Sequence, residues 1–205
     1  MPLYKSIAVD DETHILIWKI TESEQQLDIP LGNNSTERIA GMKSELHRRA
    51  YLSVRHLLAI ADYSDTDLIY SEAGKPSLSD GVFISITHSH EFSAIILSSK
   101  PVGIDIEKQR DKIIRIEDKF VSDKEKEYLE QSENRIKTLT ILWGAKEALY
   151  KLYGTTGLSF KNHIDVAPFN LTANYTKASI NFDKKMTFYE IIFTEFESFT
   201  CVYAF

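Results

Sequence analysis

Residues 102–107 read Val-Gly-Ile-Asp-Ile-Glu, and this alternation of apolar and polar side chains predicts a β-strand. Alternate side chains of a strand share a face, so Gly103, Asp105 and Glu107 point to one side and the valine and isoleucines to the other. The two carboxylates lie ~7 Å apart and repel each other unless a positive group is near. Such a pair suits Mg²⁺, which takes oxygen ligands. The alternative is a solvent-facing edge strand with two surface acids.

The most regular helical pattern follows at about 134–153, and Gly154 is expected to end this helix. Trp143, Glu147 and Lys151 are spaced by four residues and therefore lie along one stripe of the helix. The stripe borders the apolar face, where a carboxylate can be shielded from solvent and held ionised by a metal. The alternative is a surface pair of Glu147 and Lys151, which contributes only ~0.2–0.5 kcal/mol.

The rest of the chain predicts strands, a helix, strands, helices and strands, in that order. Further strands bounded by turn residues are expected at 3–9, 13–20, 66–70, 82–87, 92–97, 179–182, 186–193 and 198–205. One long helix is expected over 35–62, with Ser35 as its N-cap. This order favours the α+β class over a doubly wound sheet. Each half combines a long amphipathic helix with short antiparallel strands, which suggests an N-terminal half at 1–100 and a C-terminal half at 101–205.

The composition is that of an ordinary globular protein. The chain has 205 residues, of which 43% are hydrophobic and 26% charged, and these values exclude disorder as a description of the whole chain. A net charge of −6 argues against broad binding to nucleic acid or to an anionic membrane surface. The single Cys201 cannot form an internal disulfide, and no apolar run approaches the ~20 residues that cross a bilayer. We therefore expect a soluble, cytoplasmic protein without a nucleic-acid or membrane partner.

Two short segments carry chemistry that the residues alone leave open. Residues 85–90, Ser-Ile-Thr-His-Ser-His, end a strand, and their hydroxyl and imidazole groups can bind phosphate. Strand alternation would place His88 and His90 on one face, but no third ligand lies at zinc spacing. Residues 74–76, Gly-Lys-Pro, can place an ammonium group against a nucleotide or simply form a turn.

Two clusters of charge have plain structural interpretations. Arg48, Arg49 and Arg55 lie on the first long helix, where solvated charge is the default, although such a cluster can attract a polyanionic ligand. Ser122 and Glu125 have the spacing of a capping box, which favours a role for Glu125 at a helix start over a catalytic one.

The order of these motifs closely resembles that of the 4'-phosphopantetheinyl transferase superfamily, in its Sfp-like, pseudo-dimeric branch. The most diagnostic elements are Gly-Ile-Asp-Ile-Glu at 103–107 and Trp-x-x-Lys-Glu-Ala-x-x-Lys at 143–151, within a resemblance that covers roughly residues 45–158. It implies two similar α+β halves related by a pseudo-twofold axis, with coenzyme A in the cleft between them. It also implies a monomer that transfers 4'-phosphopantetheine from coenzyme A to a serine of an apo acyl or peptidyl carrier protein, releasing 3',5'-ADP.

The resemblance also assigns roles to single residues. Asp105, Glu107 and Glu147 would hold Mg²⁺, with Lys151 near the pyrophosphate and Glu147 as the base for the carrier serine. The nucleotide of coenzyme A would be contacted by His88, near the 3'-phosphate, by Ser89, by Lys75 and Pro76 along the adenine nucleotide, and by one of Arg48, Arg49 or Arg55. Carrier proteins are typically acidic, so one would dock on the basic residues after the strand, Lys108, Arg110, Lys112 and Arg115.

Two alternatives stay open at this point. A catalytically silent module on the same fold would bind coenzyme A or a carrier protein without transfer, although the intact Asp105, Glu107, Glu147 and Lys151 disfavour it. A purely structural α+β domain would show no rise in melting temperature with coenzyme A and Mg²⁺, whereas specific binding would raise it.

Overall fold

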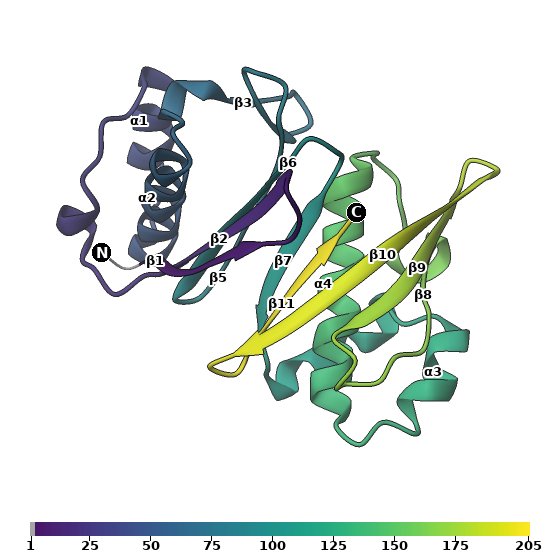
Figure 1. Cartoon of the computed structure of the whole chain (residues 1–205). Helices are drawn as coiled ribbons and strands as arrows, with labels where there is room; N and C mark the ends of the chain where they lie inside the picture. The colour runs from purple at the N-terminus through teal and green to yellow at the C-terminus, as the bar shows by residue number, and fades with distance from the viewer. Residues whose placement is uncertain (1–2) are drawn as a thin grey trace. The chain divides into compact units, whose positions relative to one another are not determined.

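The computed structural model describes residues 3–205 and divides the chain into two compact units, Met1–Pro101 (unit 1) and Val102–Phe205 (unit 2). Each unit combines helices with an antiparallel sheet, as Figure 1 shows, so the expected α+β class is confirmed. Across residues 3–205, no helix combines the length and the apolar character needed to cross a membrane.

Unit 1 is built around the long helix α2 (Glu45–Ile60), which packs against strands β2 and β6 of a sheet with the order β1-β2-β6-β5. A separate hairpin is formed by β3 and β4. The other elements of the unit are β1 (Leu3–Ala8), β2 (Thr13–Lys19), η1 (Glu24–Leu27), α1 (Asn33–Ala40), η2 (Asp65–Asp67), β3 (Leu68–Tyr70), β4 (Pro76–Leu78), β5 (Phe83–Ser89) and β6 (Phe92–Ser98).

The single helix expected over 35–62 is wrong, because the structure contains two helices there, α1 and α2. Gly41 caps the C-terminus of α1, and the Ser44 hydroxyl caps α2 by accepting a hydrogen bond from the backbone N–H of His47. Ser35 is not an N-cap but lies within α1, where its hydroxyl donates to Asp65. The apolar spacing continued across the break and concealed these caps.

Unit 2 is built around α4 (Arg135–Tyr153), which packs against β7 and β11 of a sheet with the order β7-β11-β10-β9-β8. Asn134 caps the start of α4, and Gly154 ends it in the left-handed conformation, as predicted. The other elements are β7 (Gly103–Lys108), η3 (Asp111–Lys119), α3 (Asp123–Leu129), α5 (Phe160–His163), β8 (Ile164–Val166), β9 (Tyr175–Phe182), β10 (Lys185–Phe196) and β11 (Phe199–Ala204).

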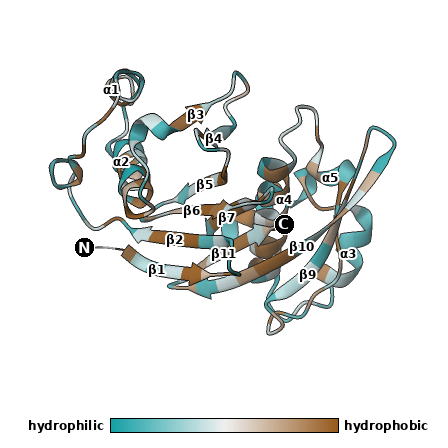
Figure 2. Cartoon of the chain, turned by 45° about the horizontal axis from the view of Figure 1, so that its top comes forward, coloured by the Kyte–Doolittle hydropathy of each residue, from teal (hydrophilic) through white to brown (hydrophobic). Residues whose placement is uncertain are grey.

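The core of unit 2 lies between α4 and the sheet. Figure 2 shows that hydrophobic residues occupy much of this sheet, whereas α3 is mainly hydrophilic. The side chains buried in this core include Leu142, Leu149, Ile180, Phe193 and Val202. Helix and strand approach closely at Gly103 of β7, where an added Cβ would lie 1.9 Å from the carbonyl oxygen of Ala148. This close contact fixes which turns of α4 face which residues of β7.

Candidate active site

The acidic face of β7 and the charged stripe of α4, predicted from separate patterns, lie together in unit 2. The ammonium of Lys151 donates to the Oδ1 atom of Asp105 at 2.7 Å and to the carbonyl oxygen of Ile104 at 2.9 Å. Two turns earlier on the helix, the Trp143 indole N–H donates to the Oε1 atom of Glu107 at 3.2 Å. The stripe therefore runs along the strand. Its first residue, Trp143, contacts Glu107, and its last residue, Lys151, contacts Asp105.

Glu147 occupies the middle of this stripe, between Trp143 and Lys151. Burial raises the pKa of its carboxyl group to about 7, and the negative charges of Asp105 and Glu107 act in the same direction against the opposing charge of Lys151. A carboxyl group with this pKa can hold or accept a proton near neutral pH, which is what acid–base catalysis requires.

The chemistry of this donor set fits a hard divalent cation. Asp105, Glu107 and Glu147 offer oxygen ligands. Burial, and after it the negative charges of Asp105 and Glu107, raise the pKa of Glu147, and a cation would relieve this repulsion. Within residues 3–205, however, no three Asp, Glu, His or Cys side chains are already gathered closely enough to hold a metal. One cationic group, the Lys151 ammonium, is already bound to Asp105.

A small pocket of about 180 Å³ adjoins this site. Glu107 and Trp143 contribute to its wall, together with a group of basic and apolar side chains that comprises Lys108, Arg110, Lys112, Ile113 and Ile116. Arg115 lies exposed on η3 but does not line the pocket. Three of the four basic residues predicted from the sequence therefore line a pocket that Glu107 also lines.

The residues predicted to contact a nucleotide lie in unit 1, at turns and strand ends. Lys75 is exposed and follows Gly74, whose φ of 78° forms the turn before Pro76 begins β4. His88 and Ser89 end β5, with the histidine exposed and the serine buried. His90 has a φ of 51° and belongs to the turn after β5, so the alternation expected for His88 and His90 does not extend to it.

Of the three candidate arginines, Arg49 donates to the carbonyl oxygen of Ile20 at 3.3 Å, and the other two differ in accessibility. Arg55 is 3% exposed, its Nε donates to Asp65 at 2.8 Å, and its guanidinium lies 3.5 Å above the ring of Tyr51. A role in nucleotide binding does not fit this enclosed position. Arg48 donates through Nε to both carboxylate oxygens of Glu24, at 2.8 and 2.9 Å, but a quarter of its side chain stays exposed. Of the two, Arg48 fits the predicted nucleotide contact.

Sequence reasoning found the capping role of Glu125 but missed its partner. The capping box is present, since the backbone N–H of Ser122 donates to Glu125 at 2.7 Å and the Ser122 hydroxyl accepts from the backbone N–H of Glu125. The same carboxylate binds the ammonium of Lys146, which is 0% exposed. A signal for this pair existed, because Lys146 follows Leu142 by four residues and so lies on the apolar side of α4, where a charge needs a partner.

The chain is similar to known proteins in sequence and, over about half of its length, in structure. A sequence model of the 4'-phosphopantetheinyl transferase superfamily matches residues 101–203. The 4'-phosphopantetheinyl transferase gsp of Aneurinibacillus migulanus is 27% identical over 143 residues, which cover 66% of this chain and 58% of that protein, so the chain spans less than two thirds of its relative. The solved structure of holo-[acyl-carrier-protein] synthase from Thermotoga maritima aligns with a TM-score of 0.44 and 17% identity, over 51% of this chain and 61% of that one.

Proposed function

Because the chain belongs to the 4'-phosphopantetheinyl transferase superfamily, we propose that it transfers the 4'-phosphopantetheine group of coenzyme A to a serine of an apo acyl or peptidyl carrier protein. The product would be the holo carrier protein, with 3',5'-ADP as the leaving group. The observation that carries this proposal is the position of Glu147, a half-buried carboxyl group with a pKa of about 7 beside Asp105, Glu107 and Lys151.

The three carboxylates are proposed to hold Mg²⁺ when it is bound, and Mg²⁺ would there neutralise negative charge on the pyrophosphate of coenzyme A. Lys151 lies at the same end of the site as Asp105 and would stabilise the charge that develops on the departing phosphate. Both contributions are electrostatic, which is the main form of catalysis in phosphoryl transfer.

The proton of the carrier serine needs an acceptor as the serine oxygen attacks the β-phosphorus. We assign this role to Glu147, which takes the proton while the new oxygen–phosphorus bond forms and the bond to the 3',5'-ADP oxygen breaks. Burial raises its pKa to about 7 when no metal is bound, and bound Mg²⁺ would lower that pKa, so the carboxylate would be ionised and able to accept the proton at neutral pH. The electron pair of the broken bond leaves with 3',5'-ADP.

Recognition of the two substrates is proposed to use different surfaces. The nucleotide of coenzyme A would be bound by unit 1 residues at turns and strand ends, namely Lys75, Pro76, His88 and Ser89, and by Arg48 of α2. An acidic carrier protein would approach along Lys108, Arg110 and Lys112, which border the pocket beside Glu107. Opposite charges at such a surface mainly speed association.

The proposal is tested by incubating the protein with coenzyme A, Mg²⁺ and a panel of apo carrier proteins, and measuring the mass gain of each carrier. Replacing Glu147→Gln keeps the shape of the side chain and removes the base, so we expect transfer to slow by about 10²–10⁴-fold. Coenzyme A binding, measured by calorimetry, should stay close to that of the wild type. The matched control is Glu130→Gln, an exposed carboxylate at the end of α3.

The outcomes separate the candidate functions. Normal turnover of the Glu147→Gln variant would remove Glu147 from the mechanism. Coenzyme A binding by the wild type without mass gain in any carrier would support a silent binding module instead. Absence of both binding and transfer would count against the proposal as a whole.

A further inference from the structure

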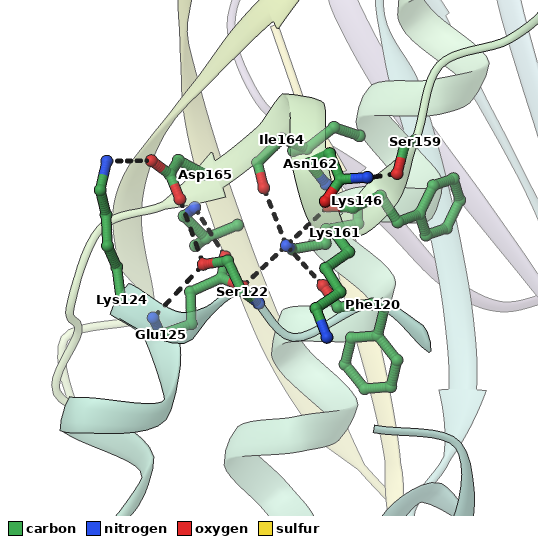
Figure 3. Close-up of polar contacts among 12 residues, drawn as sticks. Phe120, Ser122, Lys124, Glu125, Lys146, Ser159, Lys161, Asn162, Ile164 and Asp165 are labelled. Atoms are coloured by element: carbon green, nitrogen blue, oxygen red, sulfur yellow. Dashed lines mark hydrogen bonds and ion pairs between the residues drawn. The ribbon is translucent and has the colours of Figure 1, made fainter. Parts of the chain in front are cut away.

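The ammonium group of Lys146 is the centre of a buried polar cluster in unit 2. Figure 3 shows it surrounded by oxygen atoms from separate segments of the chain. It donates to the backbone carbonyl of Phe120 at 2.7 Å, and to the Glu125 carboxylate and the carbonyls of Phe160 and Ile164 at 2.8 Å each. An ammonium has three hydrogens, so all three are used and at least one of them is shared between two of the four acceptors.

The cluster is buried, and both the Lys146 ammonium and the two oxygens of the Glu125 carboxylate have hydrogen-bond partners. Lys146 and Glu125 are 0% and 1% exposed, and the second oxygen of Glu125 accepts from the backbone N–H of Val166 at 3.0 Å. Three of the acceptors of Lys146 are main-chain carbonyls that precede α3, begin α5 and begin β8. The side chain of Lys146 therefore links the main chain at three places, before α3 and at the starts of α5 and β8, to helix α4.

Two of the residues whose carbonyls bind Lys146, Phe120 and Phe160, have rings that contact Trp143. The centroid of the indole ring lies 5.1 Å from that of the Phe120 ring, in an edge-to-face arrangement, and 5.4 Å from that of the Phe160 ring. Trp143 precedes Lys146 by three residues on the same helix, and its N–H donates to Glu107. The residues whose carbonyls bind the ammonium are thus the residues whose rings flank the indole.

We propose that Lys146 is a positioning residue: its ammonium holds the backbones of Phe120 and Phe160, whose rings hold the Trp143 indole where it donates to Glu107. The importance of Glu107 rests on the proposed function, in which it is a magnesium ligand. Lys146 itself touches no substrate, because it is completely buried. It acts through Trp143 on the orientation of one carboxylate.

The consequence of removing the ammonium follows from the groups it leaves behind. Carbonyls of Phe120, Phe160 and Ile164 would lose their donor, and buried carbonyls without a donor draw the backbone toward water. The two phenyl rings would then no longer confine the indole. Loss of a hydrogen-bond partner that orients a metal ligand typically changes metal affinity or activity by about 10–100-fold.

The first test uses the fluorescence of Trp143. The chain has two tryptophans, so a Trp18→Phe background leaves Trp143 as the sole emitter. In that background Lys146→Met should shift the emission to longer wavelength and raise the acrylamide quenching constant several-fold. The matched control is Arg55→Met, which removes the buried cation of unit 1 and should leave both readouts unchanged. Unchanged emission and quenching in a folded Lys146→Met protein would overturn the proposal.

A second variant keeps the test decisive if Lys146→Met does not fold. Phe160→Leu leaves every hydrogen bond of the ammonium intact but removes one of the rings beside the indole. We expect Trp143 to become more accessible to acrylamide in this variant as well. If Phe160→Leu folds and Trp143 is quenched as in the wild type, the rings do not confine the indole and the proposal is wrong.

The catalytic meaning is tested by combining Lys146→Met, or Phe160→Leu in its place, with Trp143→Phe. Because both changes act on Glu107 through the same indole, the double variant should lose no more kcat/KM than the worse single variant. Losses that multiply would show an independent structural effect and overturn the positioning role. A wild-type protein without transfer activity would count against the proposed function alone, since the fluorescence arm would still decide how Trp143 is held.

Discussion

Units 1 and 2 place their long helices on sheets in which three neighbouring strands follow a common order. In unit 1 the strand before the helices, β2, pairs with the last strand, β6, which forms a hairpin with β5. In unit 2 the first strand, β7, pairs with the last strand, β11, which forms a hairpin with β10. The helix packs on the first and last of these strands in both units. The two units can therefore be compared element by element.

Both long helices carry a buried cation, but the two cations bind different kinds of acceptor. Arg55 of α2 pairs with Asp65 and also donates to the hydroxyl of Tyr51, so its main acceptors are side chains. Lys146 of α4 pairs with Glu125 and otherwise binds only backbone carbonyls. A planar guanidinium suits fixed side-chain partners, whereas a compact ammonium can collect carbonyls from several directions. The buried cation of unit 2 therefore joins main chain from three segments, whereas that of unit 1 mainly joins side chains.

The largest expected effect is the loss of either buried cation. Lys146→Met and Arg55→Met each leave a buried carboxylate without its partner, which should lower the free energy of unfolding by about 3–5 kcal/mol. Denaturant titration gives the size of each loss, and hydrogen exchange gives its place. Exchange should rise around 120, 160 and 164 for Lys146→Met, and around α1 and η2 for Arg55→Met. If hydrogen exchange rose in the same segments in both variants, the two cations would not act locally in their own units.

The next effect concerns Glu147, whose pKa is raised to about 7 from an ordinary value of 4.5. The folded state binds the proton more tightly than the unfolded state, so the carboxyl group favours folding at low pH and this contribution is lost as pH rises through 7. The free energy of unfolding of the wild type, relative to Glu147→Gln, should fall by up to about 3 kcal/mol between pH 5 and pH 8. Denaturant titrations of both proteins without added metal measure it. A difference that is constant or grows with pH contradicts the raised pKa.

The smallest expected effect separates two glycines. Gly103→Ala would force a Cβ against the carbonyl of Ala148, a backbone atom, and should cost about 1–3 kcal/mol as β7 moves from α4. Gly41→Ala in unit 1 meets nothing closer than 3.6 Å at a helical φ of −78°, so it should be neutral or stabilise by about 0.4–1 kcal/mol. Thermal melts of both variants measure the contrast. Equal shifts would mean that the helix–strand contact of unit 2 is not tight.

Local patterns predicted the parts of the fold that depend on local order. The strand at 102–107 and the helix at 134–153 were predictable because alternation and helical spacing are strong there. The break between α1 and α2 was not, since the apolar spacing runs through residues 41–44. The strands β4 and β8 have three residues each, too few to show a period.

The site was also predictable in part, but only for residues whose positions follow from spacing within a single helix or strand. The residues of β7 and α4 that meet were found because period 2 and period 3.6 place them on single faces. The enclosure of Arg55 and the pairing of Lys146 with Glu125 depend on partners 10 and 21 residues away in the chain. Spacing within one element carries no information about such partners, so these two roles required the structure.

The complete burial of Lys146 has a practical consequence for chemical labelling. Its amine can react with a lysine-directed reagent only when the segments around it separate, whereas exposed amines such as that of Lys124 react at once. The slow modification of this one amine, followed by peptide mapping, would therefore time the spontaneous opening of unit 2 in the unmutated protein.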